Sequence, residues 1–172
     1  YGLSIVLGTC DVTMLELVEM YGILTNNGLF QKANFIPLRK PAQKKRMLSK
    51  ESSFIVRKML EENIPPYQNK PKDIIDIPVG YKTGTSIGFK DSWSVGIFDR
   101  YIIAVWIGNF DGQGNNSFLG RTMAAPLLFN IAYPILDETP KEHLLPREIP
   151  PDNAIHVEVC SVSGALPNDN CP

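Results

Sequence analysis

The hexapeptide Tyr81-Lys82-Thr83-Gly84-Thr85-Ser86 is the most informative stretch of this 172-residue chain. Lysine supplies a compact positive charge with three donors, and the hydroxyl residues add further donors and acceptors. Such a set suits a ligand carboxylate, because ionised acceptors make the stronger hydrogen bonds. Gly84 has no Cβ, so a ligand backbone can approach it closely. On an edge strand, these residues are predicted to pair with an extended peptide and to present an amide to a developing oxyanion.

The residues around this hexapeptide are typical of β-structure. Residues 92–98 are strand-like, and the continuous apolar run 102–107 favours a central strand that is covered on both faces. Asp99-Arg100 lies between them and predicts a tight turn. We therefore predict β-structure across residues 74–109.

Two helices are predicted before these strands. Thr13 and Glu16 have the spacing of a capping box, and apolar residues follow at helical spacing up to a stop signal at Asn27-Gly28. Ser49 is a suitable N-cap for a second helix that runs from residue 50 to about residue 62.

A third helix is predicted after Thr122, with Pro134 kinking or ending it. The residues expected on its buried face are Leu127, Leu128, Ile131 and Ile135. Together these elements predict an α+β fold, in which helices flank an antiparallel sheet of several strands.

The composition narrows the class of protein. A hydrophobic content of 44% is enough for a real core, and a net charge of −1 gives no sign of nucleic-acid binding. No stretch approaches the roughly 20 apolar residues that a membrane-spanning helix needs. His143 and His156 lie near no cluster of possible metal ligands, so we predict neither a metal nor a cofactor.

Several segments together resemble the transpeptidase domain of class A penicillin-binding proteins. The segments similar to its last strands are Lys82-Thr83-Gly84-Thr85-Ser86, Asp91-Ser92-Trp93 and Ala104-Val105-Trp106-Ile107-Gly108. Residues 1–8, 15–17 and 24–28 are similar to the part of that domain after its Ser-x-Asn motif. The tail Cys160-Ser161-Val162-Ser163-Gly164, with Cys171-Pro172, resembles the start of the extra C-terminal domain of the 1C type.

The resemblance implies a partial penicillin-binding transpeptidase fold, which is similar to that of β-lactamases, and a role for each residue of the hexapeptide. In this family a serine attacks the D-Ala-D-Ala bond of a peptidoglycan stem peptide, and β-lactams trap the acyl-enzyme. Lys82 and Thr85 are expected to be catalytic, with the Thr85 amide as an oxyanion donor. Lys82, Thr83, Gly84, Thr85 and Ser86 are expected to bind substrate. Asp91 and Trp93 match the family pattern and are interpreted as structural, and the loop 111–116 is expected beside the site entrance.

Two partner motifs of the family, Ser-x-x-Lys and Ser-x-Asn, are absent from this sequence. We therefore expect the chain to be a fragment that is inactive alone and that needs the missing N-terminal half of the domain as its partner. The resemblance also implies a parent with a glycosyltransferase domain, at the periplasmic side of the inner membrane, with its anchor outside this chain. A non-catalytic β-lactam or peptidoglycan sensor, an interaction module, and a remnant without an independent role remain alternatives.

The expected domain boundaries follow from the resemblance and from proline content. Residues 1–136 are assigned to the C-terminal part of the transpeptidase domain and residues 137–154 to a Pro-rich linker. Residues 155–172 are the expected start of a truncated further domain, in which residues 155–159 alternate like a strand.

The three cysteines leave the redox compartment open. Cys160 and Cys171 enclose a short loop rich in turn residues and could pair in an oxidising compartment. Two unpaired thiols fit the same sequence equally well. Cys10 is expected to be a small core residue.

Overall fold

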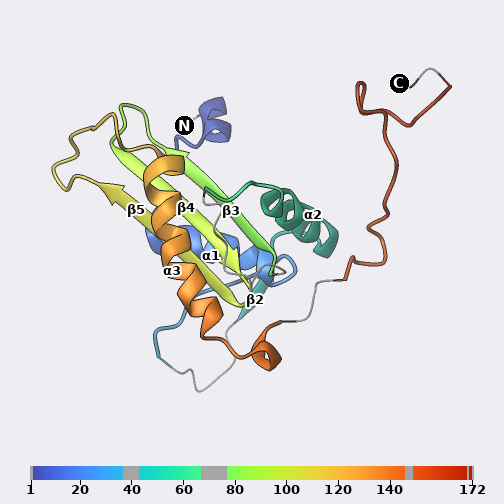
Figure 1. Cartoon of the computed structure of the whole chain (residues 1–172), viewed down its shortest axis with the longest axis horizontal. Coiled ribbons are helices and arrows are strands. Elements are labelled where there is room, and N and C mark those ends of the chain that lie inside the picture. Colours follow the sequence, from blue (N-terminus) through green and yellow to red (C-terminus); the bar gives the residue numbers. More distant parts are fainter. Residues whose placement is uncertain (1, 37–42, 67–76, 146–148, 170, 172) are drawn as a thin grey trace.

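A three-stranded antiparallel sheet between helices forms the centre of the molecule (Figure 1). The computed structural model describes residues 2–36, 43–66, 77–145, 149–169 and 171. The strands are β3 (Val79–Thr85), β4 (Asp91–Phe98) and β5 (Tyr101–Gly108), in the order β3-β4-β5. Helix α3 (Ala125–Asp137) lies over one face of the sheet, and helix α1 (Met14–Thr25) lies over the other. The predicted α+β class is therefore confirmed.

The strand register assigns each residue to a face of the sheet. Gly84 pairs with Trp93, and Thr83 pairs with Ser94. Because side chains alternate along a strand, Lys82 and Gly84 belong to one face, and Thr83 and Thr85 belong to the face under α3. Asp99 and Arg100 form the predicted turn between β4 and β5, with Asp99 at φ 54°.

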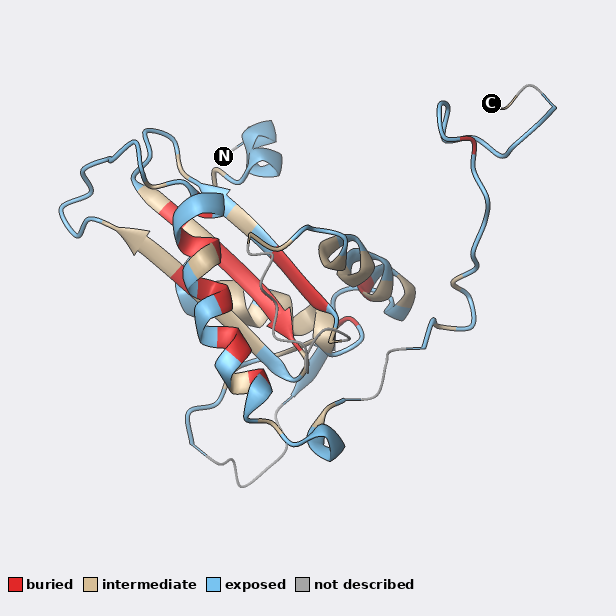
Figure 2. Ribbon diagram, viewed as in Figure 1, coloured by how far each residue is buried: buried red, intermediate tan, exposed pale blue. Residues whose placement is uncertain are grey.

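The hydrophobic core lies between α3 and the sheet. Figure 2 shows the buried residues of the helix and of the strands. The Phe129 ring packs edge-on against Tyr81 at a centroid distance of 5.0 Å and against Phe98 at 5.5 Å. Edge-to-face aromatic pairs add about 0.5–1.5 kcal/mol beyond their buried area. This cluster therefore fixes α3 above β4 and β5, with the Phe129 ring reaching Tyr81, the first residue of the hexapeptide.

The buried face of α3 differs from the one predicted. Its buried residues are Ala125, Leu128, Phe129, Ala132, Tyr133 and Leu136. Leu127 and Ile131 are exposed at 42% and 40%, and Ile135 is half-buried. The helix is apolar all round, so periodicity alone could not select the face, and alanines allow it to approach the sheet closely. The helix also continues past Pro134 to Asp137.

The first two predicted helices form with their predicted caps. The Thr13 hydroxyl accepts from the Glu16 amide at 3.2 Å, and the Glu16 carboxylate accepts from the Thr13 amide at 2.8 Å. The Thr13 amide and the Thr13 hydroxyl both donate to the Glu16 carboxylate, and these two hydrogen bonds lower its pKa. Helix α2 (Lys50–Glu61) has Ser49 as its N-cap.

A small hairpin that the sequence did not predict joins α1 to α2. Its strands are β1 (Leu29–Gln31) and β2 (Lys44–Arg46). Arg46 Nη1 donates to the carbonyls of Asn27 and Leu48, both at 2.9 Å, and so ties the hairpin to the ends of both helices. A short helix, η1 (Gly2–Leu7), precedes α1.

Two predictions about strands were wrong within the part of the chain that the structure describes. The central strand is β4, and β5 is at an edge, although both of its faces are covered as expected. Residues 155–159 form no strand, because no second strand is available to pair with them there. The C-terminal segment instead runs away from the sheet (Figure 1). Residues 74–76 of the predicted β-region lie outside the described residues.

We predict opposite effects from two glycine-to-alanine changes. At Gly96 a Cβ would collide with the buried Phe98 ring and come within 3.0 Å of Leu128 Cδ2. Gly96→Ala should therefore lower the free energy of unfolding by about 1–3 kcal/mol. At Gly22, in α1, the nearest atom is Ile102 Cδ1 at 4.0 Å. Gly22→Ala should raise stability by about 0.5–1 kcal/mol. Urea denaturation of both variants measures this difference, and a neutral Gly96→Ala would contradict the packing described.

Candidate functional site

The hexapeptide lies on the edge strand of the sheet, as predicted. β3 pairs with β4 on one side, and its other side pairs with no strand among the described residues. Helix α2 packs against the start of β3. A Cβ placed on residue 80, which is glycine, would lie 3.2 Å from Leu60 Cβ. The Asn63 side chain donates to the Tyr81 carbonyl at 2.8 Å. From Lys82 onward the strand is exposed or half-buried.

The backbone of β3 presents its odd-numbered residues to this open edge. The Ser86 amide donates to the Asp91 carbonyl at 3.0 Å, so Ser86 faces β4, whereas the Tyr81 carbonyl bonds to Asn63 instead. In an antiparallel ladder, the residues that bond to the neighbouring strand alternate with those that do not. The amides of Thr83 and Thr85 consequently face the open edge, where an extended peptide could pair with them.

The Lys82 ammonium is held at the same strand. Lys82 is exposed, and its Nζ donates to the Thr83 carbonyl at 2.7 Å. An ammonium has three donors, so this contact leaves two for a ligand. The positive charge therefore lies next to the open backbone of β3.

The Thr85 hydroxyl is oriented by the segment that leads into α3. The Gly120 amide donates to Thr85 Oγ1 at 3.0 Å. A Cβ on Gly120 would lie 2.5 Å from the Gly84 carbonyl oxygen and 2.8 Å from that of Trp93, so this contact requires glycine. Because the hydroxyl oxygen already accepts a hydrogen bond, its own hydrogen is left to donate to a ligand acceptor.

Ser86 has a structural contact that differs from its predicted role. Its hydroxyl accepts from the Asp91 amide at 2.8 Å, and so closes the loop between β3 and β4. Asp91 Oδ1 in turn accepts from the Trp106 indole at 2.9 Å. This bond agrees with the structural interpretation of Asp91, while substrate binding by Ser86 stays a prediction.

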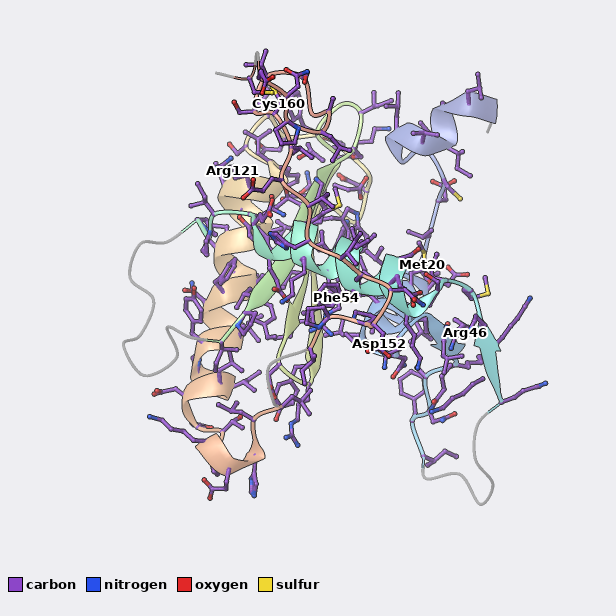
Figure 3. All side chains as sticks on the ribbon, turned by 90° about the vertical axis from the view of Figure 1, so that its right-hand side faces the viewer. Met20, Arg46, Phe54, Arg121, Asp152 and Cys160 are labelled. Carbon is purple, nitrogen blue, oxygen red and sulfur yellow. The ribbon has the colours of Figure 1, made fainter. Side chains whose placement is uncertain are left out.

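Arg121 is a nearby cation that the sequence analysis missed. It follows Gly120 at the start of the α3 segment and is labelled in Figure 3. Burial raises the pKa of Tyr81, and the Arg121 charge opposes that rise, which shows that Arg121 lies near this part of β3. Arg121 belongs to no recognisable sequence motif. Its position near β3 follows only from the contact that the preceding residue, Gly120, makes with that strand.

An aromatic row crosses the sheet beside the hexapeptide. The rings of Trp93 and Trp106 have a centroid distance of 6.4 Å, and those of Trp106 and Phe110 are 5.8 Å apart. Both tryptophans are half-buried, and Phe110 is fully exposed at 101%. In the loop that follows, the Asn115 amide donates to the Phe89 carbonyl at 2.9 Å. This hydrogen bond holds the loop 111–116 against the β3–β4 loop.

Other parts of the described structure offer less to a ligand. Two pockets of about 230 and 320 Å³ lie around the end of α3, near Thr139 and Pro140, at the end of the sheet away from Thr85. Within the described ranges, no three His, Cys, Asp or Glu side chains form a metal-binding group. None of the helices described is long and apolar enough to span a membrane.

Comparison with known proteins shows which family the chain belongs to. Residues 1–128 match the family described as penicillin binding protein transpeptidase domain. Penicillin-binding protein 1C of Escherichia coli (strain K12) is 26% identical over 172 residues, which cover 98% of this chain and 22% of that protein. Penicillin-binding protein 1A of Clostridium novyi (strain NT) is 30% identical over 177 residues, which cover 94% and 19%.

A solved structure shows the same fold. The crystal structure of penicillin-binding protein 1A from Haemophilus influenzae matches with a TM-score of 0.74 and 18% identity, over 98% of this chain and 32% of that chain. The chain thus spans about a fifth of the length of the two curated relatives described above. The resemblance seen in the sequence is confirmed, since the family match covers most of the chain, and the protein belongs to the penicillin-binding protein transpeptidase domain family.

Proposed function

We propose that this chain supplies the substrate-binding edge of a peptidoglycan D,D-transpeptidase. The observation that carries the proposal is the open edge of β3, where the Lys82 charge, the Thr85 hydroxyl and backbone amides lie together. A stem peptide is an extended chain with a terminal carboxylate, and this edge offers a backbone partner and charge-assisted donors for it. β-Lactams, which mimic that peptide, are proposed to bind at the same edge.

The chemical roles follow from the positions of these groups. The Thr83 and Thr85 hydroxyls hold the substrate carboxylate, and the Lys82 and Arg121 charges favour its ionised form. The Thr85 amide, which faces the open edge, donates to the oxyanion of the tetrahedral intermediate. Lys82 also assists the serine of the Ser-x-Asn motif, which lies outside this sequence. Gly84 leaves room for the substrate backbone.

The nucleophile is proposed to come from a segment outside these 172 residues. No serine of the chain has a lysine three positions later. Two features of the surface support a missing neighbour. Among the described residues no strand pairs with the outer edge of β5, although both of its faces are covered. Large apolar side chains are also exposed on η1 and α2, among them Leu3, Leu7 and Met59. An N-terminal half of the same domain would cover such surfaces.

The proposed location is the periplasmic side of the bacterial inner membrane, where stem peptides are cross-linked. The parent is proposed to carry a membrane anchor and a glycosyltransferase domain. Residues 137–154 are proposed as a linker to a further C-terminal domain. The middle of this segment is attached to the turn between β4 and β5, because the Leu145 amide donates to Asp99 Oδ1 at 2.7 Å.

The second candidate function is a non-catalytic module that binds β-lactams or peptidoglycan. The observation that favours it is that the proposed carboxylate-binding edge is formed within this chain. The DNA directly upstream separates the two candidates, because an in-frame Ser-x-x-Lys and Ser-x-Asn would support the enzyme.

We predict that the isolated chain is not acylated by penicillin. Residues of a catalytic set act as a unit, so a chain without the nucleophile should form no covalent adduct. The purified chain is incubated with a fluorescent penicillin and separated on a denaturing gel. A labelled band at stoichiometric yield would place a nucleophile within these 172 residues and would refute the proposed division of the site.

In the full-length protein that supplies the serine, Lys82→Ala should slow acylation about ten- to a hundredfold. A hydrogen bond to a charged group is worth about 1.5–3 kcal/mol, and each 1.4 kcal/mol changes a rate about tenfold. The measurement is the second-order acylation rate with a β-lactam, together with the melting temperature. Lys90→Ala is the matched control, because Lys90 is also exposed but lies in the adjoining loop. A wild-type rate for Lys82→Ala, or a loss explained by unfolding, would show that the assignment is wrong.

Thr85→Val should reduce acylation less than Lys82→Ala does. The substitution removes the hydroxyl donor and the acceptor for the Gly120 amide, but it keeps the Thr85 backbone amide. Thr85→Ser is the control, because it keeps the hydroxyl. The same rate measurement should rank wild type and Thr85→Ser above Thr85→Val. An equal loss in the serine and valine variants would exclude a role for the hydroxyl.

A further inference from the structure

Two backbone turns near the C-terminus each include a cysteine. The Cys160 amide donates to the Ala165 carbonyl, and the Gly164 amide donates to the Cys160 carbonyl, both at 2.8 Å. Gly164 has φ +69°, a conformation that favours glycine in such a turn. In the second turn the Cys171 amide donates to the Asn168 carbonyl at 2.9 Å. Each of the two cysteines therefore lies at one end of its own backbone turn.

The Cys160 side chain is enclosed within its turn, although the segment around it is exposed. Cys160 is buried at 8% exposure, whereas the residues on either side of it are exposed. Hydrogen bonds from the Ser163 side chain and amide, the Val162 amide and Cys171 lower the pKa of the Cys160 thiol from 9.0 to about 6. A thiolate is the reactive form in disulfide exchange.

We propose that Cys160 and Cys171 form an intrachain disulfide that closes residues 160–171 into a covalent ring. The proposal stands on the two turns and on the burial of Cys160 within an exposed segment, and it is independent of the transpeptidase function. The disulfide would stabilise a turn that has few packing contacts with the rest of the protein. Val162 and Leu166 within the turn are exposed at 80% and 71%, so it has almost no core of its own. Short segments without a core are commonly stabilised by disulfides in oxidising compartments.

The reaction needs a disulfide-containing oxidant, such as oxidised glutathione or a thiol oxidoreductase. The Cys160 thiolate attacks one sulfur of the oxidant, whose S–S bond breaks, and the first thiolate leaves. The Cys171 thiol gives its proton to solvent and attacks the Cys160 sulfur, and the second thiolate leaves. The two cysteines lose two electrons, which the oxidant gains, and both leaving thiolates take up protons.

The remaining chemistry of the described region favours this pairing over other uses of the thiols. The structure shows no group of three possible metal ligands among the described residues, so a metal has only the two sulfurs to bind. Cys10, the third cysteine, contacts the carbonyl of its neighbour Asp11 at 3.6 Å. It lies between η1 and α1, far from the C-terminal turn in the sequence.

The test equilibrates the whole chain with oxidised glutathione, followed by alkylation and mass spectrometry. The Cys10→Ser variant, as the background, should lose about 2 Da without adding glutathione. Cys10→Ser combined with Cys160→Ser, or with Cys171→Ser, should instead gain one glutathione. A protease that cuts before aspartate cleaves before Asp169, between the two cysteines, and before Asp152. Peptides 152–168 and 169–172 should therefore remain joined until a reductant is added.

Either of two results would overturn the proposal. In one, both thiols of the Cys10→Ser variant are alkylated or glutathionylated separately after equilibration. In the other, the wild-type chain joins Cys10 to Cys160 or Cys171 instead. Because the readout is the mass of the C-terminal peptides, neither result depends on β-lactam binding. A failed disulfide and a failed transpeptidase assignment can thus be told apart.

Discussion

The contact of Gly120 with the edge of β3 is the constraint on which the site depends. It joins the segment that starts α3 to β3, which carries the hexapeptide, and to β4, through the hydrogen bond to Thr85 and the close approach to the backbone of Gly84 and Trp93. Any side chain at residue 120 would separate these elements. The aromatic core under α3 keeps the helix in place, and the helix start in turn keeps the Thr85 hydroxyl oriented.

Because side chains alternate along β3, its two faces carry different kinds of residue. The face under α3 is buried at Val79 and Tyr81 and then passes into the exposed hydroxyls of Thr83 and Thr85. The opposite face carries Lys82 and Gly84 beside the tryptophans. Within seven residues, β3 therefore contributes buried core residues, a positive charge and hydroxyl donors. The buried first half holds the strand in place, and the exposed second half carries the groups that are available to a ligand.

Local signals in the sequence predicted the helices and the site strand well. The caps at Thr13 and Ser49 and the turn at Asp99-Arg100 rest on interactions between near neighbours, which a sequence shows directly. The hexapeptide was also placed correctly at an edge. In contrast, α3 is apolar all round, so its buried face depends on which residues fit closely against the sheet. β5 pairs with β4, its neighbour in the chain, and whether a further strand pairs with its outer edge depends on segments distant in the chain, which periodicity cannot identify.

The site residues divide in the same way. Lys82 and Thr85 were recognised because residue types in one short motif carry their chemistry. The hydrogen bond that the Asp91 amide donates to the Ser86 hydroxyl was not foreseen, because a motif does not tell a hydroxyl that closes a loop from one that binds a ligand. Arg121 was missed because its place near β3 comes from folding across 35 residues between Thr85 and Gly120.

The aromatic row has an optical consequence. Trp93 and Trp106 are the two tryptophans of the chain, and both lie beside the hexapeptide. Trp106 donates its indole N–H to Asp91, and Trp93 is next to Gly84 across the ladder. Intrinsic tryptophan emission therefore originates almost wholly beside the proposed ligand edge. A change in polarity at that edge would alter the fluorescence of the entire protein, so the unmodified chain carries its own spectroscopic probe of the site.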